Sequence, residues 1–146
     1  MYFLSQCIYS FFCVMGFSIM FNLPRRLILS AALSGMVGWY VYLLIQTMTT
    51  SFILPSLIGS IVVGIMGEGF AYIKKHPATM FTIPGIIPFV PGYGIYYTML
   101  YIVEEDFNMA MTTGAQSLFI AIAIACGIVI ATSLMRLLKP TIIKYF

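Results

Sequence analysis

The chain has 146 residues, of which 62% are apolar and only 8% are charged, with a formal net charge of +3. Soluble domains carry about 25% charged residues, so seven basic and four acidic side chains are too few to cover a surface of this size in water. The composition therefore excludes soluble, disordered and nucleic-acid-binding proteins, and it indicates a protein whose solvent is a lipid bilayer.

Charge-free apolar stretches divide the chain into five predicted spans. A membrane-spanning helix needs about 20 mostly apolar residues, so five helices fill the chain as a single membrane domain, residues 1–146. We predict an all-α, polytopic integral membrane protein, with its fourth helix broken by a run of proline and glycine. The predicted spans, in chain order, are about 2–22, 27–46, 53–73, 79–103 and 111–135.

The basic residues predict the orientation of these spans. They occupy the first connection, the third connection and the segment after the fifth span: Arg25, Arg26, Lys74, Lys75, Arg136, Lys139 and Lys144. All seven fall on one side of the membrane if all five segments cross it, and basic connections stay in the cytoplasm. This pattern predicts an outside N-terminus and a cytoplasmic C-terminus.

Small residues recur four positions apart on three of the predicted helices. Such spacing lets helix backbones approach closely in lipid. Two interpretations remain open, which are packing within the five-helix bundle and docking to a second subunit. The residues are Ala31, Ser34, Gly35 and Gly38; Ser56, Ser60 and Gly64; and Ala123, Gly127 and Ala131.

No sequence motif indicates an enzyme, a cofactor or a metal site. The chain contains no glycine-rich phosphate loop, no GxSxG and no HExxH motif. Cys7, Cys13 and Cys126 lie in apolar runs without metal-ligand spacing, so we interpret them as small hydrophobic residues. We expect the polar residues in or beside the spans to form hydrogen bonds between helices; these are Asn22, Gln46, Thr98 and Gln116.

The fourth span is unusual because three prolines and three glycines fall within residues 84–94 (PGIIPFVPGYG). Each proline removes a backbone donor and disfavours helix in the residue before it. Unpaired backbone at membrane depth is tolerated only where protein or a water-filled cavity covers it. We therefore predict that residues 84–92 are unwound and face an internal cavity, the alternative being a kink without a ligand.

A half-helix from Ile95 to Glu104 is expected to follow the unwound segment. Its N-terminus would direct unpaired N–H groups and a partial positive charge toward the midplane, an arrangement that transporters use for anionic groups of substrates. The candidate substrate-path residues are Pro84, Gly85, Pro88, Pro91, Gly92 and Tyr93.

Two ionisable residues are candidates for proton coupling or gating. Glu68 is the only acidic residue inside a predicted span, and a charged carboxylate there costs on the order of 3 kcal/mol on insertion scales. It either binds a proton or extends to Lys74 or Lys75 at the interface. His76 lies at the entrance to the broken segment, where an ordinary imidazole could exchange protons or simply be solvated.

The sequence resembles the threonine/serine exporter (ThrE) family in two motifs. Residues 16–26 (GFSIMFNLPRR) resemble the end of the first span of the family's smaller subunits. The run comprising His76-Pro77, Phe81-Thr82 and residues 84–92 (PGIIPFVPG) resembles the family's proline-glycine signature. With the five-span layout, this resemblance covers nearly the whole chain.

The resemblance implies a subunit of a secondary transporter in the bacterial cytoplasmic membrane. Such proteins export threonine and serine with the proton gradient, and a related pair is linked to export of the dicarboxylate succinate. In the split form a larger five-span subunit is the partner of a chain like this one, which would not transport alone. The alternatives are a non-transporting scaffold and a passive channel.

Overall fold

The computed structural model describes residues 2–143, and every regular element in that range is helical. Apolar segments form helices in lipid because a helix satisfies its own backbone hydrogen bonds. Side-chain surroundings are described for residues 3–138, so those of Lys139 and Lys144 lie outside the described residues. The elements are α1 (Tyr2–Met20), α2 (Arg25–Met48), α3 (Ile53–Lys74), α4 (Thr79–Gly85), η1 (Ile87–Phe89), α5 (Gly92–Val103) and α6 (Phe107–Ile143).

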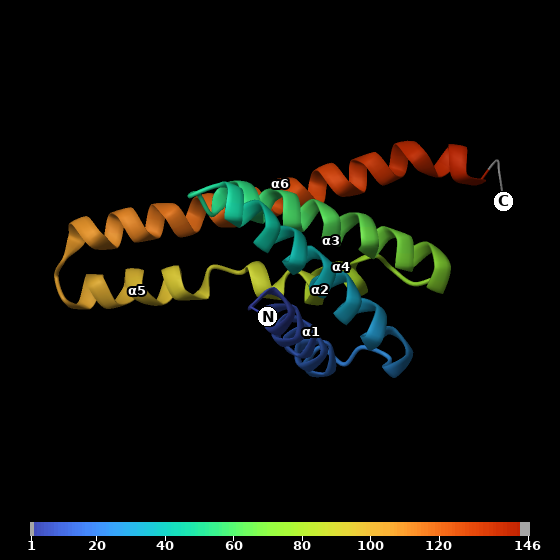
Figure 1. Cartoon of the computed structure of the whole chain (residues 1–146), viewed down its shortest axis with the longest axis horizontal. Helices are drawn as coiled ribbons and strands as arrows, with labels where there is room; N and C mark the ends of the chain where they lie inside the picture. Colours follow the sequence, from blue (N-terminus) through green and yellow to red (C-terminus); the bar gives the residue numbers. More distant parts are fainter. Residues whose placement is uncertain (1, 144–146) are drawn as a thin grey trace.

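Four of the described helices, α1, α2, α3 and α6, are long and apolar enough to cross a membrane. A fifth crossing is obtained if Thr79–Phe89 and Gly92–Val103, which meet at a bend of 54°, form one broken span. In Figure 1, α1 to α4 form a bundle, and α6 runs along it and past it. The hairpin of α5 and α6 projects beyond the α2–α3 connection.

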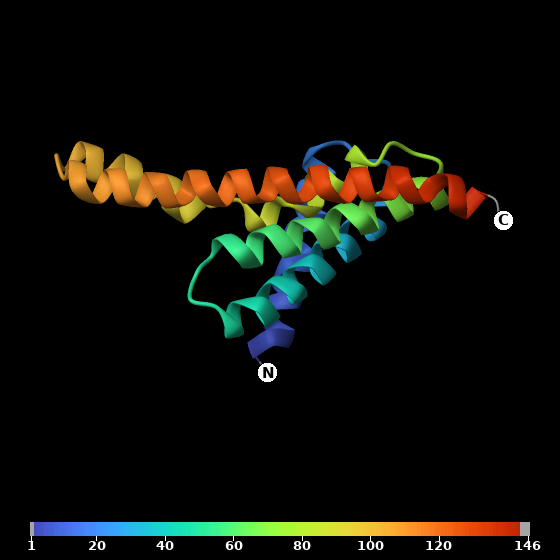
Figure 2. The same ribbon diagram turned by 90° about the horizontal axis from the view of Figure 1, so that it is seen from above.

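The connections that carry basic residues gather at one end of the molecule. The α1–α2 connection, the α3–α4 connection and the end of α6 lie toward that end in both views (Figures 1 and 2), and the α2–α3 and α5–α6 connections lie toward the opposite end. Arg25, Lys74 and Arg136 flank this end in sequence and are exposed. The arrangement has the charge separation expected of a protein that follows the rule for basic connections.

The small-residue faces predicted from sequence pack inside the chain. A Cβ atom placed on Gly64 of α3 would lie 2.5 Å from the Cβ of Ala131 of α6, and one on Gly127 would meet Ser60. On α2, a Cβ on Gly35 would lie 3.1 Å from the carbonyl oxygen of Gly85. Of the two interpretations, the structure therefore favours packing within the bundle for these faces.

The helix break is shorter than the sequence predicted. Pro84 and Gly85 end α4 instead of opening an unwound segment, and α5 begins at Gly92 instead of Ile95. For Pro88 and Pro91 the reason is that proline also suits the start of a helix, where its missing N–H has no partner to lose. Pro88 lies in the first turn of η1, and Pro91 is the residue before α5.

The last helix is longer than the predicted span at 111–135. It begins at Phe107 because the carboxylate of Asp106 accepts a hydrogen bond of 3.1 Å from the Met109 N–H, which caps the helix. It continues through Arg136 because a helix need not end where the bilayer ends. Its 37 residues extend about 55 Å, compared with about 30 Å of hydrocarbon.

Phe89 joins the broken segment to the bundle. Its ring is 4% exposed and packs with Val63 and Ile124. It fits between α2 and α3 because the nearest positions are glycines: a Cβ on Gly59 would lie 2.5 Å from the ring, and one on Gly38 would lie 3.3 Å from it.

The variant Gly59→Ala is expected to destabilise the protein, because the new methyl group overlaps the Phe89 ring and overpacking costs about 1–3 kcal/mol. The matched control is Gly69→Ala in the same helix, where a Cβ has open space within 4 Å. Alanine is the better helix former, so this control should be neutral or stabilising. Thermal unfolding of detergent-purified protein measures both variants, and equal midpoints would contradict this account of the break.

Candidate functional site

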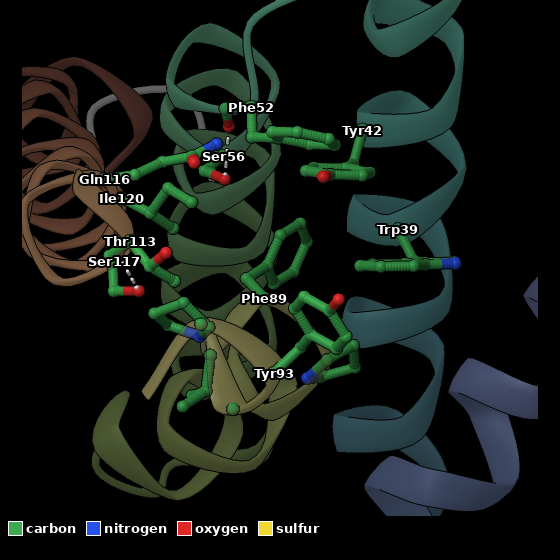
Figure 3. A pocket seen from close by; sticks show the side chains of 15 residues that line it. Trp39, Tyr42, Phe52, Ser56, Phe89, Tyr93, Thr113, Gln116, Ser117 and Ile120 are labelled. Atoms are coloured by element: carbon green, nitrogen blue, oxygen red, sulfur yellow. Dashed lines mark hydrogen bonds between the residues drawn. The ribbon is translucent and has the colours of Figure 1, made fainter. Parts of the chain in front are cut away.

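A cavity of about 330 Å³ lies where α5 begins, between the break and helices α2, α3 and α6 (Figure 3). Its volume falls within the range of small-molecule sites. The lining residues come from α2 (Trp39, Tyr42), the start of α3 (Phe52, Ser56), the break and the first turn of α5 (residues 88–94), and α6 (Thr113, Gln116, Ser117, Ile120).

Three aromatic rings form one wall of the cavity. Trp39 and Tyr42, one turn apart on α2, stack with centroids 4.7 Å apart and an interplanar angle of 6°. Phe89 meets both rings edge-on, at 5.6 and 5.7 Å. Such edge-to-face and stacked pairs are favourable, so the burial of Phe89 also fixes the orientation of this wall.

The opposite wall is polar and uncharged. The hydroxyls of Ser56 and Ser117 donate to the carbonyls of Phe52 and Thr113, at 2.7 and 2.8 Å. Their oxygen lone pairs remain able to accept hydrogen bonds. The Gln116 amide extends from α6 toward Ser56 (Figure 3). None of the lining residues carries a formal charge.

The N-terminus of α5 adds backbone donors to the cavity. Pro91 precedes the helix and provides no side-chain cap. The first α-helical hydrogen bond runs from the Ile95 N–H to the Pro91 carbonyl, at 3.0 Å. The amides of Tyr93 and Gly94 precede that bond and therefore belong to the turn that a helix leaves unpaired. Together with the positive end of the helix dipole, they can bind an anionic group.

The cavity brings together four of the six predicted substrate-path residues, namely Pro88, Pro91, Gly92 and Tyr93. The other two, Pro84 and Gly85, are buried in the α4 interface with α2 and α3. A Cβ on Gly85 would lie 3.0 Å from the Ser34 hydroxyl, so close packing accounts for this glycine.

The two proton-coupling candidates lie away from the cavity. Glu68 is buried, with 8% of its surface exposed. It follows Ser56 by twelve residues on α3, which is about 18 Å along the helix. His76 is exposed at the α3–α4 connection, where it lines a surface depression with Lys75 and Pro77.

Sequence reasoning did not identify the α2, α3 and α6 residues of the cavity. Aromatic and hydroxyl side chains in charge-free spans were a usable signal, but their spacing does not show that three helices converge. Thr98 was expected to bond between helices, and instead its hydroxyl donates to Gly94 of its own helix at 2.6 Å. Gln116 faces the cavity.

The sequence model of the family described as "Threonine/Serine exporter, ThrE" matches residues 6–134, which is most of the chain. The chain therefore belongs to the threonine/serine exporter family, whose members are membrane transporters and not enzymes. Its apolar helices agree with a multi-pass membrane protein. No solved structure matches the chain.

The variant Phe89→Ala is expected to change the fluorescence of Trp39, the single tryptophan of the chain. Loss of the edge-on ring admits water and should shift the emission to longer wavelength. Stability should fall by about 3–5 kcal/mol, as for other buried phenylalanines. Phe107→Ala is the control, since that ring is 67% exposed at the start of α6. Identical emission spectra for the two variants would contradict the described wall.

Proposed function

We propose that this chain is the smaller subunit of a split threonine/serine exporter that works with a larger five-span partner subunit in the bacterial cytoplasmic membrane. It moves a small amino acid outward at the expense of the proton gradient. The observation that carries the proposal is the uncharged cavity at the N-terminus of α5, in a chain that belongs to this exporter family.

The cavity offers a partner for each part of a hydroxy-amino acid. The carboxylate accepts hydrogen bonds from the amides of Tyr93 and Gly94 at the start of α5. The ammonium group lies at the aromatic wall that Trp39 and Tyr42 form, because aromatic rings attract cations. The hydroxyl or the rest of the side chain reaches the Gln116 amide on the polar wall.

A dicarboxylate such as succinate is the second candidate substrate, but the lining favours the amino acid. A second carboxylate would need a cationic partner, since an uncompensated charge in a low-dielectric cavity is costly. The lining residues include no lysine, arginine or histidine. An ammonium group is instead attracted to the aromatic wall, so a zwitterion matches this cavity better than a dianion.

Glu68 is the proposed proton-coupling residue, with His76 as a second candidate at the cytoplasmic entrance. Glu68 is buried on α3, and its neighbour Gly67 packs against α4, where a Cβ would lie 3.4 Å from the Thr82 nitrogen. α4 leads directly into the break. A change of charge on Glu68 therefore acts on the α3–α4 contact and, through α4, on the cavity.

A partner subunit is proposed because no residue of α5 is buried by the described part of the chain. A cavity bounded by such a helix needs further protein to close it. The basic connections support the orientation proposed for the subunit, with an outside N-terminus and a cytoplasmic C-terminus. Export without a proton gradient would favour a passive channel, and absence of any export would favour a scaffold.

The double variant Pro88→Ala/Pro91→Ala is expected to abolish most export, because a continuous helix would pair the amides that bind the carboxylate. We expect efflux to fall at least about tenfold, equivalent to about 1.4 kcal/mol, with membrane insertion retained. The measurement is efflux of labelled threonine, serine and succinate from cells that express the chain with and without its partner. Pro77→Ala in the exposed α3–α4 connection is the control, and normal efflux by the double variant would refute the site.

The variant Glu68→Gln should weaken proton-driven export while protein levels stay unchanged, because the amide cannot exchange a proton. Efflux is measured with and without an imposed pH gradient. Glu68→Asp, which keeps a carboxylate at the same position, is the control. If Glu68→Gln retains both the rate and the pH dependence of the unmodified protein, Glu68 is not the coupling residue.

A further inference from the structure

The helix that leaves the cavity carries a continuous row of tyrosines. Tyr93, Tyr97 and Tyr101 follow one another at four-residue spacing, with ring centroids 4.3 and 6.0 Å apart. Tyr96 lies beside them, 5.4 Å from the ring of Tyr97. Because residues four apart share a helix face, these rings form one surface, which we call the tyrosine face. It begins at Tyr93 in the cavity wall.

A different side of α5 is purely aliphatic. Ile95, Met99 and Ile102 recur at spacings of four and three residues, and all three are exposed. Ile95 and Met99 line a separate groove of about 440 Å³ between α5 and α6. We call these three residues the aliphatic face. The helix therefore presents hydroxyl-bearing rings in one direction and hydrocarbon in another.

A third side of α5 rests on α6 through small residues. A Cβ on Gly114 of α6 would lie 3.0 Å from Thr98, and one on Gly94 would meet Ser117. Among the described elements, α6 is the only one that packs extensively against α5, as the projecting hairpin shows (Figure 1). The described part of the chain thus leaves the aliphatic face exposed. On the tyrosine face, Tyr93 and Tyr96 are exposed, and Tyr97 and Tyr101 are half-buried.

Hydrocarbon is an unsuitable neighbour for the tyrosine face. A buried tyrosine hydroxyl normally finds a hydrogen-bond partner, and lipid-facing tyrosines gather at the headgroup level, where water is present. Tyr93 and Tyr101 are separated by about 12 Å along the helix axis. A helix that crosses the membrane therefore cannot place all these hydroxyls in one interfacial layer, whereas the aliphatic face suits lipid at every depth.

We propose that the tyrosine face is one wall of a water-filled conduit from the cavity to the acidic α5–α6 connection, while the aliphatic face contacts lipid. This inference rests on the proposed exporter function and extends its substrate path. Ring faces attract an ammonium group, and hydroxyls bind a carboxylate. Several weak sites in a row let a substrate advance without being held. The carboxylates of Glu104, Glu105 and Asp106 then lie at the exit.

Paired cysteine substitutions at matched depth test the conduit. Tyr97→Cys and Tyr101→Cys probe the tyrosine face, and Met99→Cys and Ile102→Cys probe the aliphatic face, each in a chain without its three native cysteines and expressed with its partner. The probe is a membrane-impermeant, water-soluble thiol reagent applied to cells. We expect reaction on the tyrosine face only, slowed by added threonine.

Each cysteine on the tyrosine face has a counterpart at a similar membrane depth on the aliphatic face, so a difference in reaction reports the face and not the depth. Tyr101 and Ile102 are neighbours in sequence, so equal reaction at both would indicate an interfacial layer of tyrosines and overturn the conduit. Absence of reaction at all four positions would also overturn it, because the tyrosine face would then be dry. Reaction on the tyrosine face that threonine leaves unchanged would overturn its role in the substrate path.

The variant Tyr97→Phe provides a second measurement that keeps the ring and removes one hydroxyl. Efflux should slow several-fold. Threonine binding to the cavity, measured by titrating threonine against Trp39 fluorescence, should be half-saturated at an unchanged concentration, because Tyr97 lies outside the cavity lining. Met99→Leu is the control. If the cysteines do not react but the Pro88/Pro91 double variant loses export, the conduit is rejected and the cavity site is retained. Normal export by that double variant would remove the cavity site itself.

Discussion

The constraint on which the structure depends is that backbone groups freed by the prolines must be covered by protein, since lipid offers no hydrogen-bond partner. α2 and α3 supply this cover because they carry glycines, which have no side chain, where the break packs against them. Gly35 admits the backbone of Gly85, and Gly38 and Gly59 admit the ring of Phe89. This ring completes the aromatic wall of the cavity.

The same break divides the protein into a closely packed part and a part with few contacts to the rest. α1 to α4 and the second half of α6 are joined by close small-residue contacts. α5 is tied to the bundle through Val90 and Pro91, and otherwise rests on the first half of α6. The cavity lies on the boundary between these parts, so a small change of angle between them alters its opening. The proposed substrate site thus lies at an interface between packed parts of the protein, as such sites do in secondary transporters.

The sequence predicted the parts of the structure that follow from local chemistry. Apolar run length located the helices, and the prolines at 84, 88 and 91 located the break. It missed how short the break is, because proline starts helices as well as ending them. It also missed the α2, α3 and α6 residues of the cavity. Trp39, Ser56 and Gln116 meet only through helix crossing angles, which depend on many distant contacts.

The short segment that comprises α4 and η1 has a consequence for biosynthesis. Thr79–Phe89 is about 16 Å long as a helix, roughly half the hydrocarbon thickness, so a membrane insertion machinery cannot retain it as an independent span. Its receiving surface on α2 and α3 lies earlier in the chain and is therefore made first. The order of the elements thus lets this segment pack against α2 and α3 as it is made, before α6 follows with Ile124, the remaining contact of Phe89.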